Sequence, residues 1–169
     1  LKLANKNHIP VTPRGSGTSL ARGPLAIYGG IILDMRFFNK IESIDISNNI
    51  VIVQPGVICD VLNEQLNKFH YFFPPDPGSS SAATIGGMIA NNAGGIQAFK
   101  YGVTANYVLW LEVVLPSGEI VDFGSQVLKS TSSYNFTGIM VGSEGTLGVI
   151  TKAALKIRPI PMARKTGFY

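Results

Sequence analysis

Apolar residues recur at helical spacing between Val57 and Phe69, and this stretch carries the clearest helical pattern in the sequence. The apolar positions of one face are Ile58, Val61, Leu62, Leu66 and Phe69. The intervening positions are largely polar: Asp60, Asn63, Glu64 and Lys68. Spacings of three and four residues place side chains on one side of an α-helix. The pattern therefore predicts an amphipathic helix over residues 57–69 that buries this apolar face.

Runs of β-branched and apolar residues predict most of the other elements. Two runs flank Asn48-Asn49 within residues 41–54, and two more flank Pro116-Ser117-Gly118 within residues 108–123, so both stretches predict hairpins. The dense apolar run Gly30–Arg36 predicts a buried strand. The remaining expected elements are the end of a helix over residues 1–7, a short strand from Ile9, a short helix over 136–141 and a last strand over 149–157. Three prolines between Tyr71 and Ser81 exclude a helix there.

The order of these elements favours an α+β fold over a doubly wound sheet. Helices and strands do not alternate regularly, as they would in a chain of βαβ units. The sequence shows no internal repeat and no linker that would divide it. We therefore expect the 169 residues to form one domain or two small lobes that share a core.

Composition and charge narrow the classes of function. Hydrophobic residues make up 46% of the chain and charged residues 14%, which excludes a disordered chain. The net charge of +4 is scattered without a basic block, so a nucleic-acid surface is not expected. The single Cys59 excludes an intrachain disulfide, and it is either a small buried residue or a reactive thiol. His8 and His70 lack metal-ligand spacing, and no signal peptide or membrane span is apparent.

Three glycine-rich loops carry the candidate chemistry: residues 13–19 (PRGSGTS), 76–87 (DPGSSSAATIGG) and 142–150 (GSEGTLGVI). Glycines expose backbone N–H groups, and concave rows of such groups bind phosphate oxygen atoms. The first loop is not a Rossmann fingerprint, because Leu20 stands at the third glycine position and no strong helix follows. No Walker A motif is present either. The loops together predict a site for a phosphate-bearing ligand.

With these loops, five segments resemble the FAD-binding domain of the vanillyl-alcohol oxidase and p-cresol methylhydroxylase superfamily (the PCMH type). They are PVTPRGSGTSL, IVIVQPGV, FFPPDPGSSSAATIGGMIANNAGG, YGVTANYVLWLEVVLPSGEIV and VGSEGTLGVITKAALKI. Within the superfamily, the sequence is most similar to the group of glycolate oxidase flavin subunits and D-lactate dehydrogenases. The resemblance covers nearly the whole chain, residues 1–169, and implies a single α+β domain of two lobes with mixed sheets and flanking helices, the cofactor lying between the lobes. It departs at Ser133–Phe136, where relatives usually show Gly-Tyr-Asp-Leu.

The resemblance implies a set of FAD-binding residues. Residues 15–19 would surround the diphosphate, Thr84, Gly86 and Gly87 would let the isoalloxazine and ribityl groups lie against the backbone, and residues 144–150 would lie near the adenine, with main-chain atoms of Val149 and Ile150 reading the base. Arg14 either pairs with a phosphate or bonds carbonyl groups of its own loop. The full expected set is Pro13, Arg14, Gly15, Ser16, Gly17, Thr18, Ser19, Pro75, Asp76, Ser79, Ser80, Ser81, Ala82, Thr84, Gly86, Gly87, Asn91, Asn92, Gly94, Glu144, Gly145, Gly148, Val149 and Ile150.

The resemblance also implies an activity. It implies an FAD-dependent oxidoreductase acting on CH–OH donors, in which a 2-hydroxy acid passes a hydride to flavin N5. The family's covering substrate domain, its leading strand and part of its first helix are expected to lie outside this sequence, so no catalytic residue is assigned, and the chain alone is expected to be inactive. FAD is expected to be non-covalent, because PRGSGTSLARG holds no histidine or cysteine.

The sequence leaves two alternatives to this activity. One is a sugar or alcohol oxidase of the same superfamily, and the other is a phosphate-ligand binding module without turnover. The expected partners are the 2-hydroxy acid and an electron acceptor of unassigned identity. The expected location is the cytoplasm, either free or at the periphery of a membrane.

Overall fold

The computed structural model describes residues 1–129, 131 and 134–163, and its centre is a five-stranded antiparallel sheet. The strand order is β3 (Ile41–Asp45), β4 (Ile50–Val53), β8 (Val149–Lys156), β6 (Val108–Val114) and β7 (Ile120–Gly124). Both predicted hairpins are confirmed as the β3–β4 and β6–β7 pairs. The last predicted strand, β8, joins them at the middle of the sheet, where it pairs with β4 and β6.

The turns of the two hairpins agree with their sequences. Asn49 adopts φ +55° in the first turn, a left-handed conformation that asparagine tolerates better than most residues. Gly118 adopts φ +82° in the second. These residues let the chain reverse, so the apolar runs on either side come together as paired strands.

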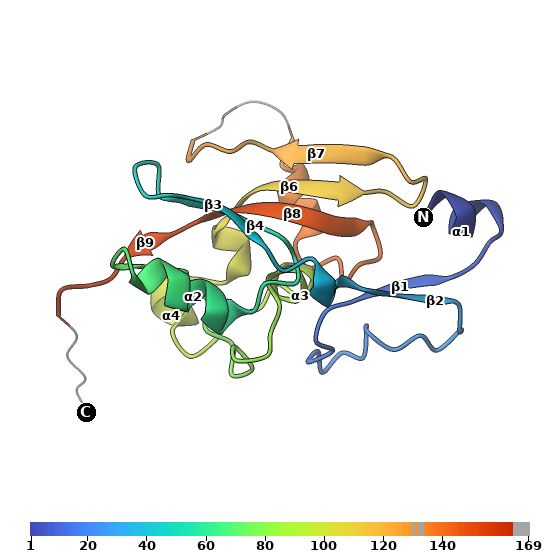
Figure 1. Ribbon diagram of the computed structural model, residues 1–169, viewed down its shortest axis with the longest axis horizontal. Helices are drawn as coiled ribbons and strands as arrows, with labels where there is room; N and C mark the ends of the chain where they lie inside the picture. Colours follow the sequence, from blue (N-terminus) through green and yellow to red (C-terminus); the bar gives the residue numbers. More distant parts are fainter. Residues whose placement is uncertain (130, 132–133, 164–169) are drawn as a thin grey trace.

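One face of the sheet carries the core, and α2 (Cys59–Asn67) and α3 (Ile85–Ala90) cover it (Figure 1). The predicted helix is confirmed, but its apolar face was predicted too wide. Leu62 and Leu66 are completely buried, whereas Val61 is 46% exposed and Phe69 is 50% exposed. Val61 lies about 100° around the helix from Leu62, and Phe69 follows the end of the helix at Asn67.

A second lobe lies at the N-terminal end of the chain, to the right in Figure 1. It contains α1 (Lys2–Lys6) and a two-stranded parallel sheet of β1 (Val11–Arg14) and β2 (Ile31–Asp34). The predicted α+β class with two lobes is confirmed by these two sheets and their flanking helices.

The prediction of a buried strand over Gly30–Arg36 is wrong in two respects. Ile31 and Ile32 are 42% and 43% exposed, because β2 pairs only with β1 among the described residues. The strand also ends at Asp34, whose carboxylate accepts hydrogen bonds from the Arg36 backbone N–H and guanidinium and so caps the 3-10 helix η1 (Met35–Phe37). Arg36 holds the pKa of Asp34 down at about 2, mainly through the side-chain hydrogen bond.

Short elements complete the described chain. They are β5 (Tyr71–Phe72) paired with β9 (Arg158–Pro159), α4 (Ala98–Tyr101), η2 (Thr104–Asn106) and α5 (Phe136–Met140). The predicted helix over 136–141 is thus confirmed as α5. The Asn135 side chain accepts a hydrogen bond from the Gly138 N–H at 2.9 Å. Asparagine and aspartate cap helices about equally well, so this departure from the family pattern keeps the cap. Ser133 lies outside the described residues.

Cys59 belongs to the core. It is 1% exposed, and burial raises the pKa of its thiol to about 12. Because the thiolate is the reactive form, the structure favours the small buried residue over the reactive thiol. No helix in the described ranges is long and apolar enough to cross a membrane.

Candidate cofactor cleft

A cleft of about 450 Å³ lies where three glycine-bearing segments meet. We call them the first loop (residues 13–24), the second segment (residues 77–93) and the third loop (residues 143–150), and each contributes lining residues. Met35 and Pro55 complete the lining. The segments are far apart in the sequence, so the cleft exists only in the folded chain.

The first loop includes the last two residues of β1, which ends at Arg14. Its backbone turns at Gly17, which has φ +72°. The N–H groups of Ser16, Gly17 and Thr18 donate to no group in the part of the chain that the structure describes. A Cβ on Gly17 would meet only Arg14 Cδ, at 3.8 Å, so open space lies over this turn. The loop therefore offers unused donors to a ligand with anionic oxygen atoms.

Gly15 holds the first loop against the second segment. A Cβ at Gly15 would lie 2.2 Å from the hydroxyl oxygen of Thr84, so only glycine allows this approach. Thr84 is 2% exposed, and its hydroxyl accepts a hydrogen bond from the Gly87 N–H at 3.2 Å. The absence of a side chain at Gly15 therefore allows the first loop to pack closely against the buried Thr84 of the second segment.

Gly86 has a packing role that the sequence did not distinguish from ligand contact. Its N–H donates to the Pro55 carbonyl at 2.8 Å, and a Cβ there would lie 2.5 Å from Pro55 Cβ. The Gly87 N–H is taken by Thr84. The backbone N–H groups of both glycines therefore form hydrogen bonds within the protein and are not available to a ligand, although both residues line the cleft.

Polar contacts tie the remaining walls together. The Ser19 hydroxyl donates to Asn91 Oδ1 at 3.0 Å, and the Asn91 amide donates to the Gly87 carbonyl at 2.9 Å. The Gly142 N–H donates to the Ile89 carbonyl at 3.0 Å and the Glu144 N–H to the Ala90 carbonyl at 2.9 Å. The first loop is therefore hydrogen-bonded to the C-cap residue of α3, and the third loop and the preceding Gly142 are hydrogen-bonded to the last two residues of that helix. The helix α3 packs on the buried face of the sheet.

Arg14 and Glu144 are the charged residues among the described lining. The guanidinium of Arg14 makes no hydrogen bond or ion pair with any described residue, although its charge helps to lower the pKa of Asp34, its neighbour in the β1–β2 pair. The structure therefore does not support its alternative role as a bridge to loop carbonyls. No histidine or cysteine lines the cleft within the described ranges, and these ranges hold no cluster of three potential metal ligands.

The cleft gathers most of the sequence-predicted site residues. Those that line it are Pro13, Arg14, Gly15, Ser16, Gly17, Thr18, Ser19, Ser79, Thr84, Gly86, Gly87, Asn91, Glu144, Gly145, Gly148, Val149 and Ile150. Residues outside the lining are Pro75, Asp76, Ser80, Ser81, Ala82, Asn92 and Gly94.

Several of the outlying residues have structural partners. The Asp76 carboxylate accepts from the Gln97 backbone at 3.2 Å and from its side chain at 3.0 Å. Asn92 accepts from the Ala105 N–H at 2.9 Å. Gly94 packs against Val103, which a Cβ would approach to 3.1 Å. These contacts support the segments that follow α3.

The predicted set of FAD-binding residues lacks a largely apolar part of the lining, although Pro77, Ala83 and Ser143 fall within the glycine-rich loops that the sequence analysis named. The residues that the set lacks are Leu20, Ala21, Gly23, Pro24, Met35, Pro55, Pro77, Ala83, Met88, Ala90, Ala93 and Ser143. Residues 20–24 could have been found by continuing the first loop to its end. Met35 and Pro55 carry no chemical signature, and only the tertiary fold brings them to the cleft.

Comparisons with known proteins agree with this geometry. A D-lactate dehydrogenase of Anaerostipes hadrus is 47% identical over 161 residues, covering 95% of this chain and 34% of that protein. The glycolate oxidase subunit GlcD of Bacillus subtilis is 43% identical over 98% of this chain and 35% of its own length. The solved structure of an alkyldihydroxyacetonephosphate synthase superposes with a TM-score of 0.81 at 29% identity, covering 96% of this chain and 32% of that one.

The chain spans about a third of the length of the relatives it matches. The sequence model of a family described as the FAD binding domain matches residues 1–124, which is most of the chain. The resemblance read from the glycine-rich loops is thereby confirmed. This protein chain belongs to the FAD binding domain family.

Proposed function

We propose that this chain holds FAD non-covalently within a flavoenzyme that oxidises a 2-hydroxy acid, and that the cofactor lies in the cleft between the three segments. The observation that carries the proposal is that the cleft is lined by Ser16, Gly17 and Thr18, whose N–H groups are unused among the described residues, and by Arg14, whose guanidinium makes no hydrogen bond there. Bound FAD would supply the redox chemistry by accepting a hydride from the carbinol carbon of the substrate. Two relatives are named for lactate and glycolate, which are both 2-hydroxy acids.

The residues of the cleft fit the parts of FAD. The N–H groups of Ser16, Gly17 and Thr18 and the guanidinium of Arg14 suit the diphosphate, because oriented amides and an arginine are strong donors to phosphate oxygen atoms. Gly15 keeps the backbone close to the second segment, and a Cβ there would fill the junction. Val149 and Ile150 are both buried and offer an apolar wall with main-chain groups, which suits the adenine.

The composition of the lining supports the proposal of non-covalent binding. A covalent flavin needs a nucleophilic side chain such as histidine or cysteine beside the ring, and the described lining has neither. Cys59 is buried, with its thiol directed to the Pro75 carbonyl at 3.7 Å. His8 and His70 lie outside the cleft.

We also propose that the cofactor domain extends beyond the matched residues 1–124 to the end of the chain. The third loop and β8 follow that range, yet they close the cleft and occupy the centre of the sheet. The alkyldihydroxyacetonephosphate synthase structure superposes on 96% of the chain, which agrees with this extent.

The first test is the identity of the cofactor. We expect the purified protein, after reconstitution with a mixture of FAD and FMN, to retain FAD, because the cleft has walls for both the diphosphate and a base. Acid denaturation followed by chromatography should release the flavin completely into the supernatant. Recovery of FMN alone would contradict the proposal, and flavin that stays with the precipitated protein would contradict non-covalent attachment.

A second test uses the turn at Gly17. We expect Gly17→Val to weaken FAD binding at least tenfold, because its branched side chain would occupy the open space over the free N–H groups. The φ of +72° adds strain of about 1–2 kcal/mol to the folded state. FAD titration and a thermal melt without FAD measure the two effects separately.

Gly29→Val is the matched control. Gly29 has φ +67°, its Cβ would meet nothing within 4 Å, and it does not line the cleft. It should lose similar stability and keep its FAD affinity. Equal losses of affinity in the two variants would show that strain, and not access to the first loop, controls binding.

A further inference from the structure

The charges of this chain are distributed unevenly between its two parts. Residues 1–40, which include the second lobe and η1, contain six lysines and arginines and one aspartate, a net charge of +5 with histidine neutral. Residues 41–169 therefore carry −1 of the total of +4. The basic residues form no continuous run in the sequence, and the fold gathers them in one lobe. They are Lys2, Lys6, Arg14, Arg22, Arg36 and Lys40.

Most of this positive charge is not neutralised within the protein. The first 33 residues contain no acidic side chain, and Asp34 is paired with Arg36, whose Nη2 lies 2.6 Å from its Oδ2. Among the described residues, the only other cation in an ion pair is Lys152 of β8. The exposed basic residues that are left without an ion pair in this lobe are Lys2, Lys6, Arg22 and Lys40.

The same lobe exposes large apolar side chains on the loop between β1 and β2. Leu25, Ile27 and Tyr28 are 52%, 76% and 85% exposed, and none of the three lines the cofactor cleft. The loop leads into the exposed Ile31 and Ile32 of β2. Large apolar side chains that lie this close together on a surface mark an interaction site.

The loop between β1 and β2 runs below these strands in Figure 1 and is folded on itself. The Leu25 N–H donates to the Arg22 carbonyl at 3.0 Å, and the Ile27 N–H donates to the Leu25 carbonyl at 2.9 Å. The Gly29 N–H donates to the Ala26 carbonyl at 2.9 Å. These local turns already order the loop, so docking it on a partner costs little conformational entropy.

Exposed apolar side chains within a basic lobe are suited to an anionic lipid surface. Lysine and arginine are attracted to anionic headgroups, and apolar and aromatic side chains enter the boundary between headgroups and acyl chains. We propose that the loop between β1 and β2 docks the second lobe on an anionic membrane. Leu25, Ile27 and Tyr28 enter the bilayer interface, and Arg22 contacts the headgroups. This surface goes beyond the proposed function, because these residues do not line the cleft.

The apolar content of the loop favours lipid over nucleic acid as the partner. Nucleic acids are bound by many lysines and arginines that each neutralise a phosphate. Residues 20–32 hold one basic residue, Arg22, and six exposed large apolar side chains. Five of the six are leucine or isoleucine, which lack the ring that stacks on a base. The loop therefore matches the interior boundary of a bilayer better than a phosphate backbone.

The test is sedimentation of the protein with lipid vesicles. We expect it to sediment with vesicles of equal parts phosphatidylcholine and phosphatidylglycerol, and to stay in solution with vesicles of phosphatidylcholine alone. Raising the salt concentration from about 0.05 M to about 0.5 M should weaken binding by about tenfold or more, because exposed charges are screened. Equal binding to both kinds of vesicle would contradict the role of the basic lobe. Binding to neither would overturn the proposal.

Ile27→Ser and Ile139→Ser form a matched pair for the apolar contact. Ile27 lies on the loop, whereas Ile139 is 57% exposed on α5. We expect Ile27→Ser to weaken vesicle binding by about tenfold, because a large aliphatic side chain no longer leaves water, and Ile139→Ser to change it by less than about twofold. Thermal melts check that both variants remain folded. Equal losses would show that the loop does not enter the membrane.

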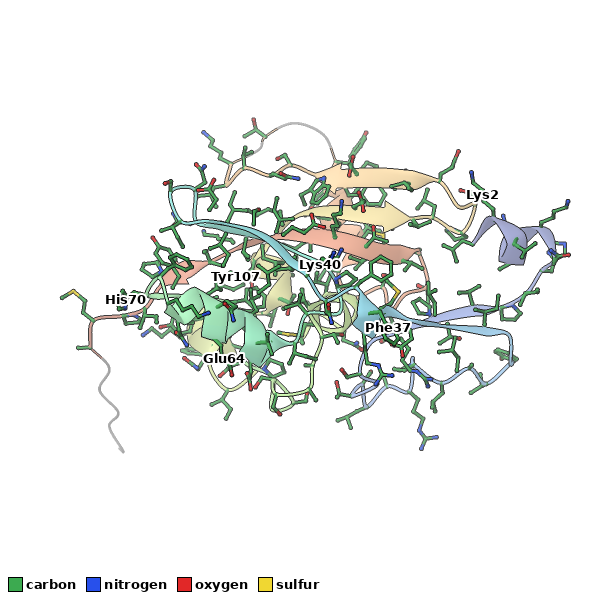
Figure 2. All side chains as sticks on the ribbon, in the orientation of Figure 1. Lys2, Phe37, Lys40, Glu64, His70 and Tyr107 are labelled. Atoms are coloured by element: carbon green, nitrogen blue, oxygen red, sulfur yellow. The ribbon has the colours of Figure 1, made fainter. Side chains whose placement is uncertain are left out.

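Arg22→Gln and Lys68→Gln form the matched pair for charge. Lys68 is exposed and lies two residues before His70, which Figure 2 shows at the opposite end of the molecule from Lys2. We expect Arg22→Gln to weaken binding to the anionic vesicles by about fivefold and Lys68→Gln to change it by less than about twofold. Equal losses would mean that the total charge of the protein, and not this lobe, controls binding.

Two further measurements separate this inference from its alternatives. Duplex DNA that binds the protein more tightly than the anionic vesicles do would overturn the choice of a lipid partner. FAD titrations of Ile27→Ser and Arg22→Gln should match the wild type, because neither residue lines the cleft. A protein that binds the vesicles but no FAD would contradict the proposed function and leave this inference intact.

Discussion

Gly15→Ala is expected to abolish measurable FAD binding, with affinity reduced by at least two orders of magnitude. The added methyl group would lie 2.2 Å from the Thr84 hydroxyl, far inside contact distance. Thr84 is buried and its hydroxyl caps the Gly87 N–H, so it cannot rotate away without losing that bond. The first loop must then move off the second segment, which separates the walls of the cleft. Overpacking of this kind costs about 1–3 kcal/mol of folding stability.

Two variants make this expectation specific. Gly78→Ala adds the same methyl group where nothing lies within 4 Å, and it should leave FAD titrations and thermal melts unchanged. Adding Thr84→Ala to Gly15→Ala removes the hydroxyl that clashes and leaves contacts of 3.3 Å or more, so part of the affinity should return. If Gly15→Ala binds FAD as tightly as the wild type, the junction between the two segments does not shape the site.

The hairpins could be predicted because the information for them is local. Alternating apolar residues decide which face of a strand is buried, and turn residues such as Asn49 and Gly118 adopt the left-handed conformations that a reversal needs. Pattern and turn lie within a few residues of each other in the sequence. The strand order of the sheet was not predictable in this way, since β8 joins strands that lie far from it along the chain.

The exposed strand β2 shows where local pattern fails. The run Gly30–Arg36 is as apolar as a buried strand, yet Ile31 and Ile32 are exposed because β2 pairs only with β1 among the described residues. Burial depends on what packs against an element, and that is decided by the whole fold. Val61 in α2 is a smaller example, where the helical pattern was right and the buried sector narrower than expected.

The glycines of the cleft could be predicted as a group but not as individuals. Gly15 allows contact with Thr84, Gly17 supplies a left-handed turn beneath open space, and Gly86 packs on Pro55. The three residues look alike in the sequence, and only their tertiary neighbours separate a packing role from a ligand role. Met35 and Pro55 could not be predicted as lining residues for the same reason, because only the tertiary fold brings them to the cleft from distant parts of the chain.

The 169-residue chain loaded with FAD is expected to show almost no oxidation of 2-hydroxy acids. Among the described lining, the ionisable side chains are Arg14 and Glu144. Arginine stays protonated in proteins and cannot act as a base. Glu144 belongs to the third loop, which we propose holds the adenine end of the cofactor, so no group of the described lining remains to take the hydroxyl proton of the substrate. In the part of the chain that the structure describes, no other charged group lines the cleft to orient a substrate carboxylate.

The expected rate follows from that lack of positioning. Orientation of reactants is worth about 7–11 kcal/mol in favourable cases, or roughly 10⁵–10⁸ in rate. Starting from a median turnover of about 10 per second, this chain should reduce its flavin more slowly than about 10⁻⁴ per second. The measurement is an anaerobic mixture of FAD-loaded chain with D-lactate or glycolate, followed by bleaching of the flavin band. Photoreduction of the same sample serves as the control, because it shows that the bound flavin can accept electrons. Bleaching within seconds by either acid would mean that the described cleft holds a catalytic group to which we have given another role.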